Sequence, residues 1–357
     1  MAQKRTAPTP TKFLVTVFLV VLIIVMGFAA VAPAPPARAA SRSPAVLAAV
    51  TETAKVTLPE TSIAGPGFDS VNSGLVHRTA IAWTGTDAAH HLNVRVGTDG
   101  VHFPTKFTFP ETSPNGPALA VGPADAPPDF ALAWRGTDAN HSLNVQTFPD
   151  GTKLTLHENS FAAPALSFTS PSSSGTLELL LAWTGTDANH SLNVLPMKVI
   201  GVGGPTSLVP GTKTVLSQFS SDAGPGLTGN ISGVDRLVLG WSTRGAQQLN
   251  LAESTDTVHF TSALGSGLPQ TSATAPQVLQ RTATDACVVW TGTDAVHHLN
   301  VQCTTQFPQF PNPAQTKTVL SETALGAPGF SMFSQSEIAW TGTDAAHHLN
   351  VATLQGT

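Results

Sequence analysis

The sequence predicts an all-β fold, a six-bladed β-propeller of four-stranded blades. One stretch occurs six times: residues 338–351 read Ile-Ala-Trp-Thr-Gly-Thr-Asp-Ala-Ala-His-His-Leu-Asn-Val, and related runs surround the Trp residues at 83, 134, 183, 241 and 290. A period of about fifty residues indicates a repeat architecture. After Ala54 the segments are short, rich in Val, Leu, Thr and Phe, and separated by Gly, Pro, Asn and Asp, which is typical of strands. Four such segments per repeat is the spacing of propeller blades.

The first repeat shows the expected strands most clearly. They lie near residues 67–71, 79–83, 91–96 and 105–109. Applied to the whole chain, the same pattern predicts blades at residues 63–109, 115–157, 163–216, 224–262, 275–320 and 328–353. The third blade carries an insertion at residues 197–210, rich in Gly and Pro, and we expect it to form an extended surface hairpin.

The frame of the repeat predicts how the ring closes. Residues 55–61, Lys-Val-Thr-Leu-Pro-Glu-Thr, match residues 106–112 and 317–323, which follow a Leu-Asn-Val strand and so belong to fourth, outer strands. The fold therefore begins with a fourth strand and ends, at residues 351–353, with a third. We expect residues 55–58 to complete the sixth blade, because that pairing hides an exposed edge. An open solenoid would not predict this permuted frame.

The first 40 residues read as a signal peptide. Basic residues precede an apolar run from residue 13 to 32, and residues 37–39, Ala-Arg-Ala, fit a small-x-small cleavage site. The run is also long enough to span a bilayer, so an uncleaved membrane anchor is the alternative. In either case we expect the propeller, residues 55–357, to lie outside the cytoplasm, with residues 41–54 as a linker.

Charge is sparse in this chain. Lys and Arg total 17 and Asp and Glu total 22, which gives a formal net charge of -5. Such a chain has no basic footprint for nucleic acid, and we expect no nucleic-acid partner.

The two cysteines, Cys287 and Cys303, both lie in the fifth repeat. A hairpin folded about Ala295 would place them opposite each other, close enough for a disulfide. An exported protein can keep such a bond. Two buried thiols are the alternative.

The loop between the second and third strands of each blade is the first candidate site. It reads Thr-Gly-Thr-Asp-Ala-x-His, and it should open on the same face as the crossovers between blades. Repetition around a ring would place the five Asp and the five His of these loops side by side on that face. Glu60, Glu111 and Glu322 would lie nearby.

The fourth repeat helps to separate folding from function. It keeps Trp241, Leu249 and Asn250 but has neither the Asp nor the His of the loop. We therefore expect Trp to pack between blades and Asn to tie the hairpin to the backbone. The Asp and His are not needed for folding by this comparison, which favours a functional role for them. The structural alternative is that the Asp caps the turn and the His satisfies the Asp. A metal site is less favoured, because each blade offers only two or three ligands.

The turns between third and fourth strands resemble a known motif. Residues 98–103, Thr-Asp-Gly-Val-His-Phe, and 255–260, Thr-Asp-Thr-Val-His-Phe, with a shorter relative at 150–151, resemble the Asp-box of sialidase-like propellers, Ser/Thr-x-Asp-x-Gly-x-Thr-Trp. Here the aromatic residue comes one position early, and the later Gly and Thr are missing. The resemblance implies a propeller fold. It does not extend to catalysis, because sialidases use an arginine triad and a Tyr–Glu pair and this chain has no Tyr.

A polar set spread over five blades favours multivalent binding over a single active site. The sequence predicts an exported, non-enzymatic, lectin-like propeller that binds glycans through avidity, with no cofactor, catalytic residue or metal. One alternative is a sialidase-like glycoside hydrolase, which would need a carboxylate pair in the central channel. The other is a protein-interaction scaffold with a purely structural motif. The predicted ligand-binding residues are Trp83, Asp87, His90, Trp134, Asp138, His141, Trp183, Asp187, His190, Trp290, Asp294, His297, Trp340, Asp344 and His347.

Overall fold

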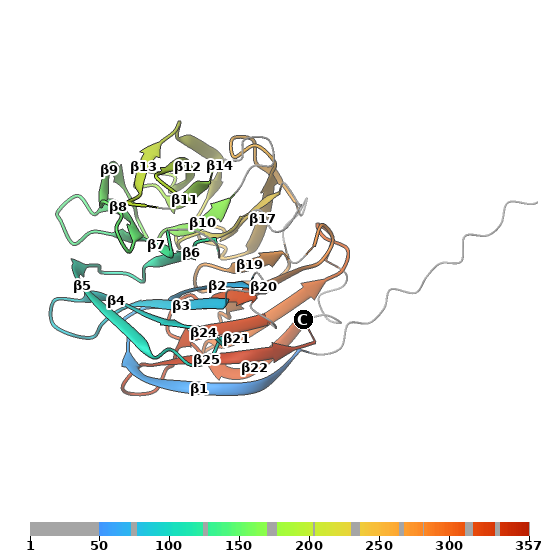
Figure 1. The fold of residues 1–357 in the computed structure, drawn as a ribbon. Helices are drawn as coiled ribbons and strands as arrows, with labels where there is room; N and C mark the ends of the chain where they lie inside the picture. Colours follow the sequence, from blue (N-terminus) through green and yellow to red (C-terminus); the bar gives the residue numbers. More distant parts are fainter. Residues whose placement is uncertain are drawn as a thin grey trace, which may run out of the picture. The chain divides into compact units, whose positions relative to one another are not determined.

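Six antiparallel sheets, one for each repeat, follow one another along the chain in the computed structural model (Figure 1). The structure describes residues 50–72, 77–123, 128–169, 177–202, 204–229, 236–263, 268–280, 282–310, 317–332 and 336–356. These residues contain no helix, and their sheets are the blades of a six-bladed β-propeller, as predicted. They belong to one compact unit.

Each blade runs from an inner first strand to an outer fourth strand. The predicted strands of the first blade agree with β2 (Gly67–Asn72), β3 (His77–Thr84), β4 (His91–Gly97) and β5 (Thr105–Thr112). The second blade has β6 (Ala118–Val121), β7 (Phe130–Arg135), β8 (Ser142–Phe148) and β9 (Leu154–Asn159), and the third has β10 (Ala165–Thr169), β11 (Glu178–Thr184), β12 (Ser191–Ile200) and β14 (Thr214–Ser220). The fourth has β15 (Gly226–Thr228), β16 (Leu237–Ser242), β17 (Leu249–Ser254) and β18 (Thr261–Ser262), and the fifth has β19 (Gln277–Gln280), β20 (Ala286–Thr291), β21 (His298–Thr304) and β22 (Lys317–Thr323). The sixth has β23 (Gly329–Met332), β24 (Ser336–Thr341), β25 (His348–Gln355) and β1 (Thr51–Thr61).

The second strands of the blades are almost entirely buried. Every residue of β16, β20 and β24 is buried, whereas the outer strand β5 begins with four exposed residues. Neighbouring blades cover both faces of the central strands, so these strands read as continuous apolar runs rather than as an alternating pattern. The core is therefore a set of layers between blades.

The ring closes through β1, as the repeat frame predicts. β1 pairs antiparallel with β25, with Val56 opposite Val351 and Thr51 opposite Gln355. Figure 1 shows the blue strand β1 beside the red strand β25. The strand starts at Thr51, so the last residues of the predicted linker belong to the sixth blade.

The insertion in the third blade is the expected hairpin. The second half of β12 pairs with β13 (Ser207–Pro210), in a register that sets Met197 opposite Pro210 and Ile200 opposite Ser207. The first half of β12 pairs with β14, which serves as the regular fourth strand.

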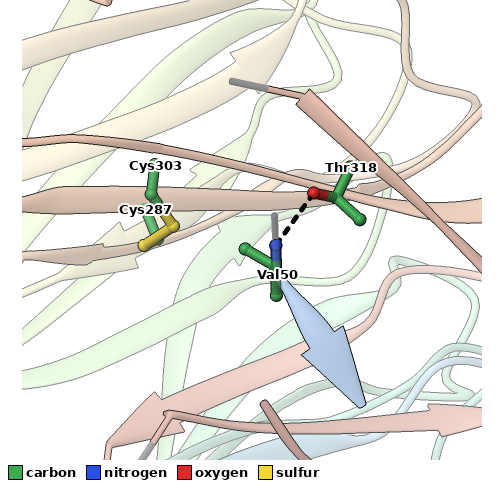
Figure 2. Close-up of a disulfide and its surroundings, with 4 residues drawn as sticks. All are labelled: Val50, Cys287, Cys303 and Thr318. Atoms are coloured by element: carbon green, nitrogen blue, oxygen red, sulfur yellow. Dashed lines mark hydrogen bonds between the residues drawn. A yellow bond between two sulfur atoms is a disulfide. The ribbon is translucent and has the colours of Figure 1, made fainter. Parts of the chain in front are cut away.

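Cys287 and Cys303 lie opposite each other on β20 and β21 and form a disulfide, as the hairpin register predicts. Figure 2 shows this bond beside Val50, the residue that precedes β1. The N–H of Val50 donates to Thr318 Oγ1 at 3.2 Å, so the start of the sixth blade's closing strand is held by the fifth blade.

The predicted signal peptide, residues 1–40, lies outside the described residues. Among the residues described from 50 onward, no helix is long and apolar enough to cross a membrane.

Candidate functional site: the loop face

The conserved tryptophans of the motif are core residues. Trp83, Trp134, Trp183, Trp290 and Trp340 are each 1% exposed, and Trp241 is 3% exposed. Each packs into a cluster shared with the preceding blade; Trp83, for example, packs with Ala339 and Leu349 of the sixth blade. The prediction that Trp packs between blades is confirmed. The prediction that Trp83, Trp134, Trp183, Trp290 and Trp340 bind ligand is wrong, because none of them has a face open to a ligand.

In four blades a lysine near the start of the fourth strand links neighbouring blades, a role that sequence reasoning missed. Its ammonium reaches a carboxylate of the preceding blade. The pairs are Lys153–Glu111 at 2.6 Å, Lys213–Glu158 at 2.7 Å, Lys55–Glu322 at 2.5 Å and Lys106–Glu60 at 3.7 Å. Lys55, Lys106 and Lys153 also lie 5.2 to 5.6 Å from the centre of the tryptophan ring in their own blade. The glutamates placed near the candidate site are thus engaged in holding blades together.

The motif asparagine ties its hairpin together, as expected. Asn93 Nδ2 donates to the carbonyl of His91 at 2.9 Å, and Asn93 Oδ1 accepts from Thr108 Oγ1 at 2.7 Å. The Nδ2 bond recurs in all six blades, including the fourth, where Asn250 donates to Gln248. Because this residue is buried, leaving its amide unpaired would be costly.

The loop aspartates cap their turns. Asp87 accepts from the backbone N–H groups of Ala89 and His91 and lies 2.8 Å from His91 Nδ1. Desolvation acts to raise the pKa of Asp87, but the side-chain and backbone hydrogen bonds outweigh it and lower the pKa. Asp138, Asp187, Asp294 and Asp344 have the same arrangement and a lowered pKa. Each aspartate therefore has a structural role, whatever else it does.

The histidine that ends the loop adopts a left-handed backbone. The φ angles are 59° at His90, 55° at His141, 51° at His190, 61° at His297 and 57° at His347. Gln247 has φ 55° at the equivalent position of the fourth blade. In three blades the ring Nδ1 lies 3.1 to 3.4 Å from the carbonyl oxygen of the loop glycine. Since a carbonyl can only accept, Nδ1 carries the hydrogen in the neutral ring, and Nε2 is left as an acceptor.

A second imidazole follows in three of the loops. His91, His298 and His348 direct Nδ1 to the loop aspartate at 2.8 to 2.9 Å, and their side chains are 36 to 39% exposed. In the second and third blades Ser142 and Ser191 take this position and donate to the same aspartate. Again Nδ1–H faces a carboxylate, so Nε2 is the outward acceptor.

These loops lie on one face with the crossovers, which we name the loop face. Thr86 of the first loop is 2.7 Å from Thr61, at the end of the sixth blade's outer strand, and the pairs Thr112–Thr137, Thr271–Thr293 and Thr323–Thr343 repeat this contact. The four threonine pairs hold the loops of the first, second, fifth and sixth blades to the blade before. The predicted ring of Asp and His on one face is therefore present.

One interface of the loop face differs from the others. Phe161, which is 42% exposed, lies with its ring centre 4.0 Å from that of His190. His190 Nδ1 is 2.9 Å from Asp222, which also pairs with Arg244 at 3.3 Å. Arg244 belongs to the degenerate fourth blade and also donates to the carbonyl of Ala188. Here Arg244 and Asp222 join the third and fourth blades, where no lysine–glutamate pair lies among the described residues.

The crossovers converge on the central axis around a small cavity of about 70 Å³, lined mainly by Gly, Pro and Ala. A Cβ on Gly67 would lie 2.7 Å from the carbonyl oxygen of Pro117, so glycine is needed for this close approach. This end of the channel offers mainly backbone and apolar groups.

Asp69 is the one acidic residue within the six inner strands as the structure describes them. It accepts from Ser70 N, Val121 N and Ser331 Oγ at 2.8 to 3.0 Å, which joins three blades. Burial outweighs these bonds and raises its pKa to about 6. A glycoside hydrolase would use two carboxyl groups, and the described inner strands supply one.

The turns that resemble an Asp-box lie between third and fourth strands, at the opposite end of the blades. Asp99 accepts from Val101 N and His102 N and contacts His102 Nδ1 at 2.6 Å, and Asp256 makes the equivalent bonds to Val258 and His259. Both aspartates cap tight turns.

No protein-family model matches the sequence, and no curated protein matches it. Solved structures do match. A protein of unknown function from Dyadobacter fermentans is 11% identical, with 86% of this chain and 99% of that chain covered and a TM-score of 0.55. The Aleuria aurantia lectin in complex with Fucα1-6GlcNAc is 10% identical, with 85% and 99% covered and a TM-score of 0.54. A Hadza microbial sialidase is 13% identical with a TM-score of 0.51, and the match covers 82% of this chain but 66% of the sialidase. At these identities the likeness establishes a sialidase-like and lectin-like propeller fold.

Proposed function

We propose that this protein is an exported, non-enzymatic β-propeller that binds glycans multivalently through its loop face. The proposal rests on one observation: five loops around the ring present the same imidazole at the same left-handed position. Where the ring's Nδ1 is bound to a carbonyl or a carboxylate, Nε2 is an acceptor for a hydroxyl group. Exposed threonine hydroxyls stand in the same loops.

Repetition suits a ligand that is itself repetitive. One imidazole and a threonine hydroxyl provide few contacts, so each site would be weak. Sites held on one rigid ring raise the effective concentration of the next site, and avidity follows without new contacts. Polysaccharides and clustered surface glycans have the required repetition. The lectin-like fold is compatible with this function. Because the tryptophans are buried, the proposed ligand-binding residues are the aspartates and histidines of the five loops.

A glycan array tests the proposal with residues 41–357, which include all the described strands. The informative variant changes the five loop histidines to glycine, because glycine accepts φ > 0 and removes the imidazole without disturbing the aspartate cap. Gln247→Gly is the matched control, since Gln247 has the same backbone conformation in the blade without the motif.

We expect the five-histidine variant to lose array binding while Gln247→Gly keeps it. Equal binding by both variants, or no binding by the unmodified protein, would remove the glycan proposal and leave the protein-interaction scaffold. Release of sugar from the array would identify a hydrolase instead.

A further inference from the structure

Comparing equivalent positions in the six blades shows which residues are particular to one blade. Positions that the fold needs are the same in every blade. Four phenylalanines stand at positions where the equivalent residues of the other blades are not phenylalanine, and all of them meet at the interface of the first and second blades: Phe107, Phe109, Phe130 and Phe148. At the position of Phe109 four other blades have Leu58, Leu156, Leu216 and Leu320, and at the position of Phe148 the other blades have Gly97, Met197, Ser254, Thr304 and Leu354.

These rings line a cavity of about 350 Å³, which we name the aromatic pocket. Phe109 and Phe130 lie 4.7 and 4.9 Å from Phe148, ring centre to ring centre, and form its wall. Phe107 lines the same pocket and is 43% exposed. The volume falls in the range of small-molecule sites.

An ion pair marks the polar side of the pocket. Arg78 of the first blade lies 2.9 Å from Asp129 of the second and also donates to the Asp129 carbonyl at 3.2 Å. Both residues line the cavity. The pair has no net charge, but it offers N–H donors and a carboxylate acceptor at one place.

An arginine at the equivalent position of another blade packs on an aromatic ring. Arg236 occupies the same repeat position in the fourth blade as Arg78 in the first, five residues before the tryptophan. Its guanidinium lies 5.6 Å from the centre of the Phe307 ring in the fifth blade, so there the cation covers the aromatic surface. Both arginines pair with a carboxylate, Arg236 with Glu253 at 3.3 Å and Arg78 with Asp129, but at the first interface the phenyl rings line a cavity.

We propose that the aromatic pocket binds a small, neutral aromatic molecule that carries a hydroxyl group. The phenyl rings supply stacking surfaces for a planar ring. A hydroxyl both donates and accepts, and so it matches the ion pair. An anionic ligand would lose its hydration in an apolar pocket whose one charged pair has no net charge to replace it. The pocket lies beside the turns between third and fourth strands, away from the loop face, so this activity is independent of glycan binding.

Equilibrium dialysis with three probes of one size tests the proposal on residues 41–357. We expect 2-naphthol to bind more tightly than naphthalene, and naphthalene more tightly than 2-naphthoate. Phe107→Ala should weaken 2-naphthol binding about tenfold, given the usual worth of an aromatic contact. Phe161→Ala, which removes an equally exposed phenyl group from the loop face, should leave it unchanged.

Asp129→Asn separates the hydroxyl recognition from simple apolar binding. It should reduce the preference for 2-naphthol over naphthalene and improve the binding of 2-naphthoate. Thermal unfolding of each variant confirms that the fold is kept. The proposal is overturned if no probe binds, if 2-naphthoate binds best, or if Phe107→Ala and Phe161→Ala have equal effects. None of these results bears on the glycan array.

Discussion

The carboxyl group of Glu337, on β24, lies directly against Gly100 in the turn that follows β4. A side chain on Gly100 would collide with the carboxyl oxygens, and Gly100 has φ +81°, so glycine leaves the room that the sixth blade's glutamate fills. Glu337 is 3% exposed. Burial, followed by the charge of Asp99, raises its pKa to about 8.

This raised pKa predicts that stability falls as pH rises from about 4.5 to about 8. A carboxyl whose pKa is higher in the folded state than in the unfolded state stabilises the fold while it is protonated, below about 4.5, and that contribution falls as pH rises towards 8. The loss is about 1.4 kcal/mol for each pKa unit. Glu337→Gln should flatten the pH dependence of the free energy of unfolding, measured in urea, between about pH 4.5 and about pH 8. Glu111→Gln, at a partly exposed glutamate, is the control. An equally steep decline in Glu337→Gln would contradict the assignment.

The loop aspartates predict the opposite dependence in acid. Hydrogen bonds lower the pKa of Asp187 against the effect of desolvation, so its contribution is present above about pH 3.8 and is lost as pH falls through the folded-state pKa. Asp187→Ala should lower the free energy of unfolding at pH 7 by about 1 kcal/mol, because two hydrogen bonds to Ser191 are lost. The difference between the variant and the unmodified protein should narrow as pH falls below about 3.8; a difference that stays constant would show that the aspartate acts otherwise.

The lysine–glutamate pairs between blades should be weak individually. Lys153 and Glu111 are partly exposed, so their coupling in a double-mutant cycle should be at most about 1 kcal/mol and should shrink in 1 M salt. Alanine at each position and at both, followed by thermal unfolding, gives the coupling. A value that stays unchanged in salt would mean that packing of the lysine on Trp134, rather than charge, holds this interface.

The hairpin asparagine should matter more than its small size suggests. Asn93→Ala leaves the His91 carbonyl and the Thr108 hydroxyl without their partner in a buried site, and we expect a loss of about 2 kcal/mol. Thr108→Val removes only one of the two bonds and should cost about half as much. Chemical unfolding of the two variants distinguishes them, and equal losses would assign the effect to the threonine bond alone.

The disulfide should add stability through the unfolded state. Cys287 and Cys303 are 16 residues apart, and closing a loop of that size is worth about 3 kcal/mol. Replacing both with Ser should lower the midpoint of thermal unfolding without altering the fold. Reductant should then destabilise the unmodified protein and leave the double variant unaffected.

The sequence predicts the ring well because the repeat itself carries the information. Trp83 and its copies fix the blade count, and the match between residues 55–61 and 106–112 fixes the closure. The same repetition hides function, because a tryptophan packed between blades and one exposed for stacking have the same pattern. Only the structure shows Trp83 to be 1% exposed. The residue types of the loop also allow a turn-capping role for Asp87, and the bonds of Asp87 to His91 show that role directly.

The aromatic pocket and the Lys153–Glu111 contact were beyond sequence reasoning for a different reason. Phe107 and Phe148 lie about forty residues apart in different blades, and nothing in their local pattern indicates that they meet. The one available signal is that the four phenylalanines break the repeat. Departures from a repeat are therefore worth comparing as carefully as its consensus.

Closure of the ring by β1 also constrains the order of folding. Val56 and Val351 are partners across nearly the whole chain, and forming so distant a contact carries the largest loop-closure entropy in the molecule. The blades between them are built from neighbouring segments and can form early, whereas the sixth blade must wait for both of its halves. Until they meet, β25 has an unpaired backbone edge, and another copy of the chain can supply its own β1 in trans. The seam at β1 and β25 is consequently the place where folding competes with strand exchange between molecules.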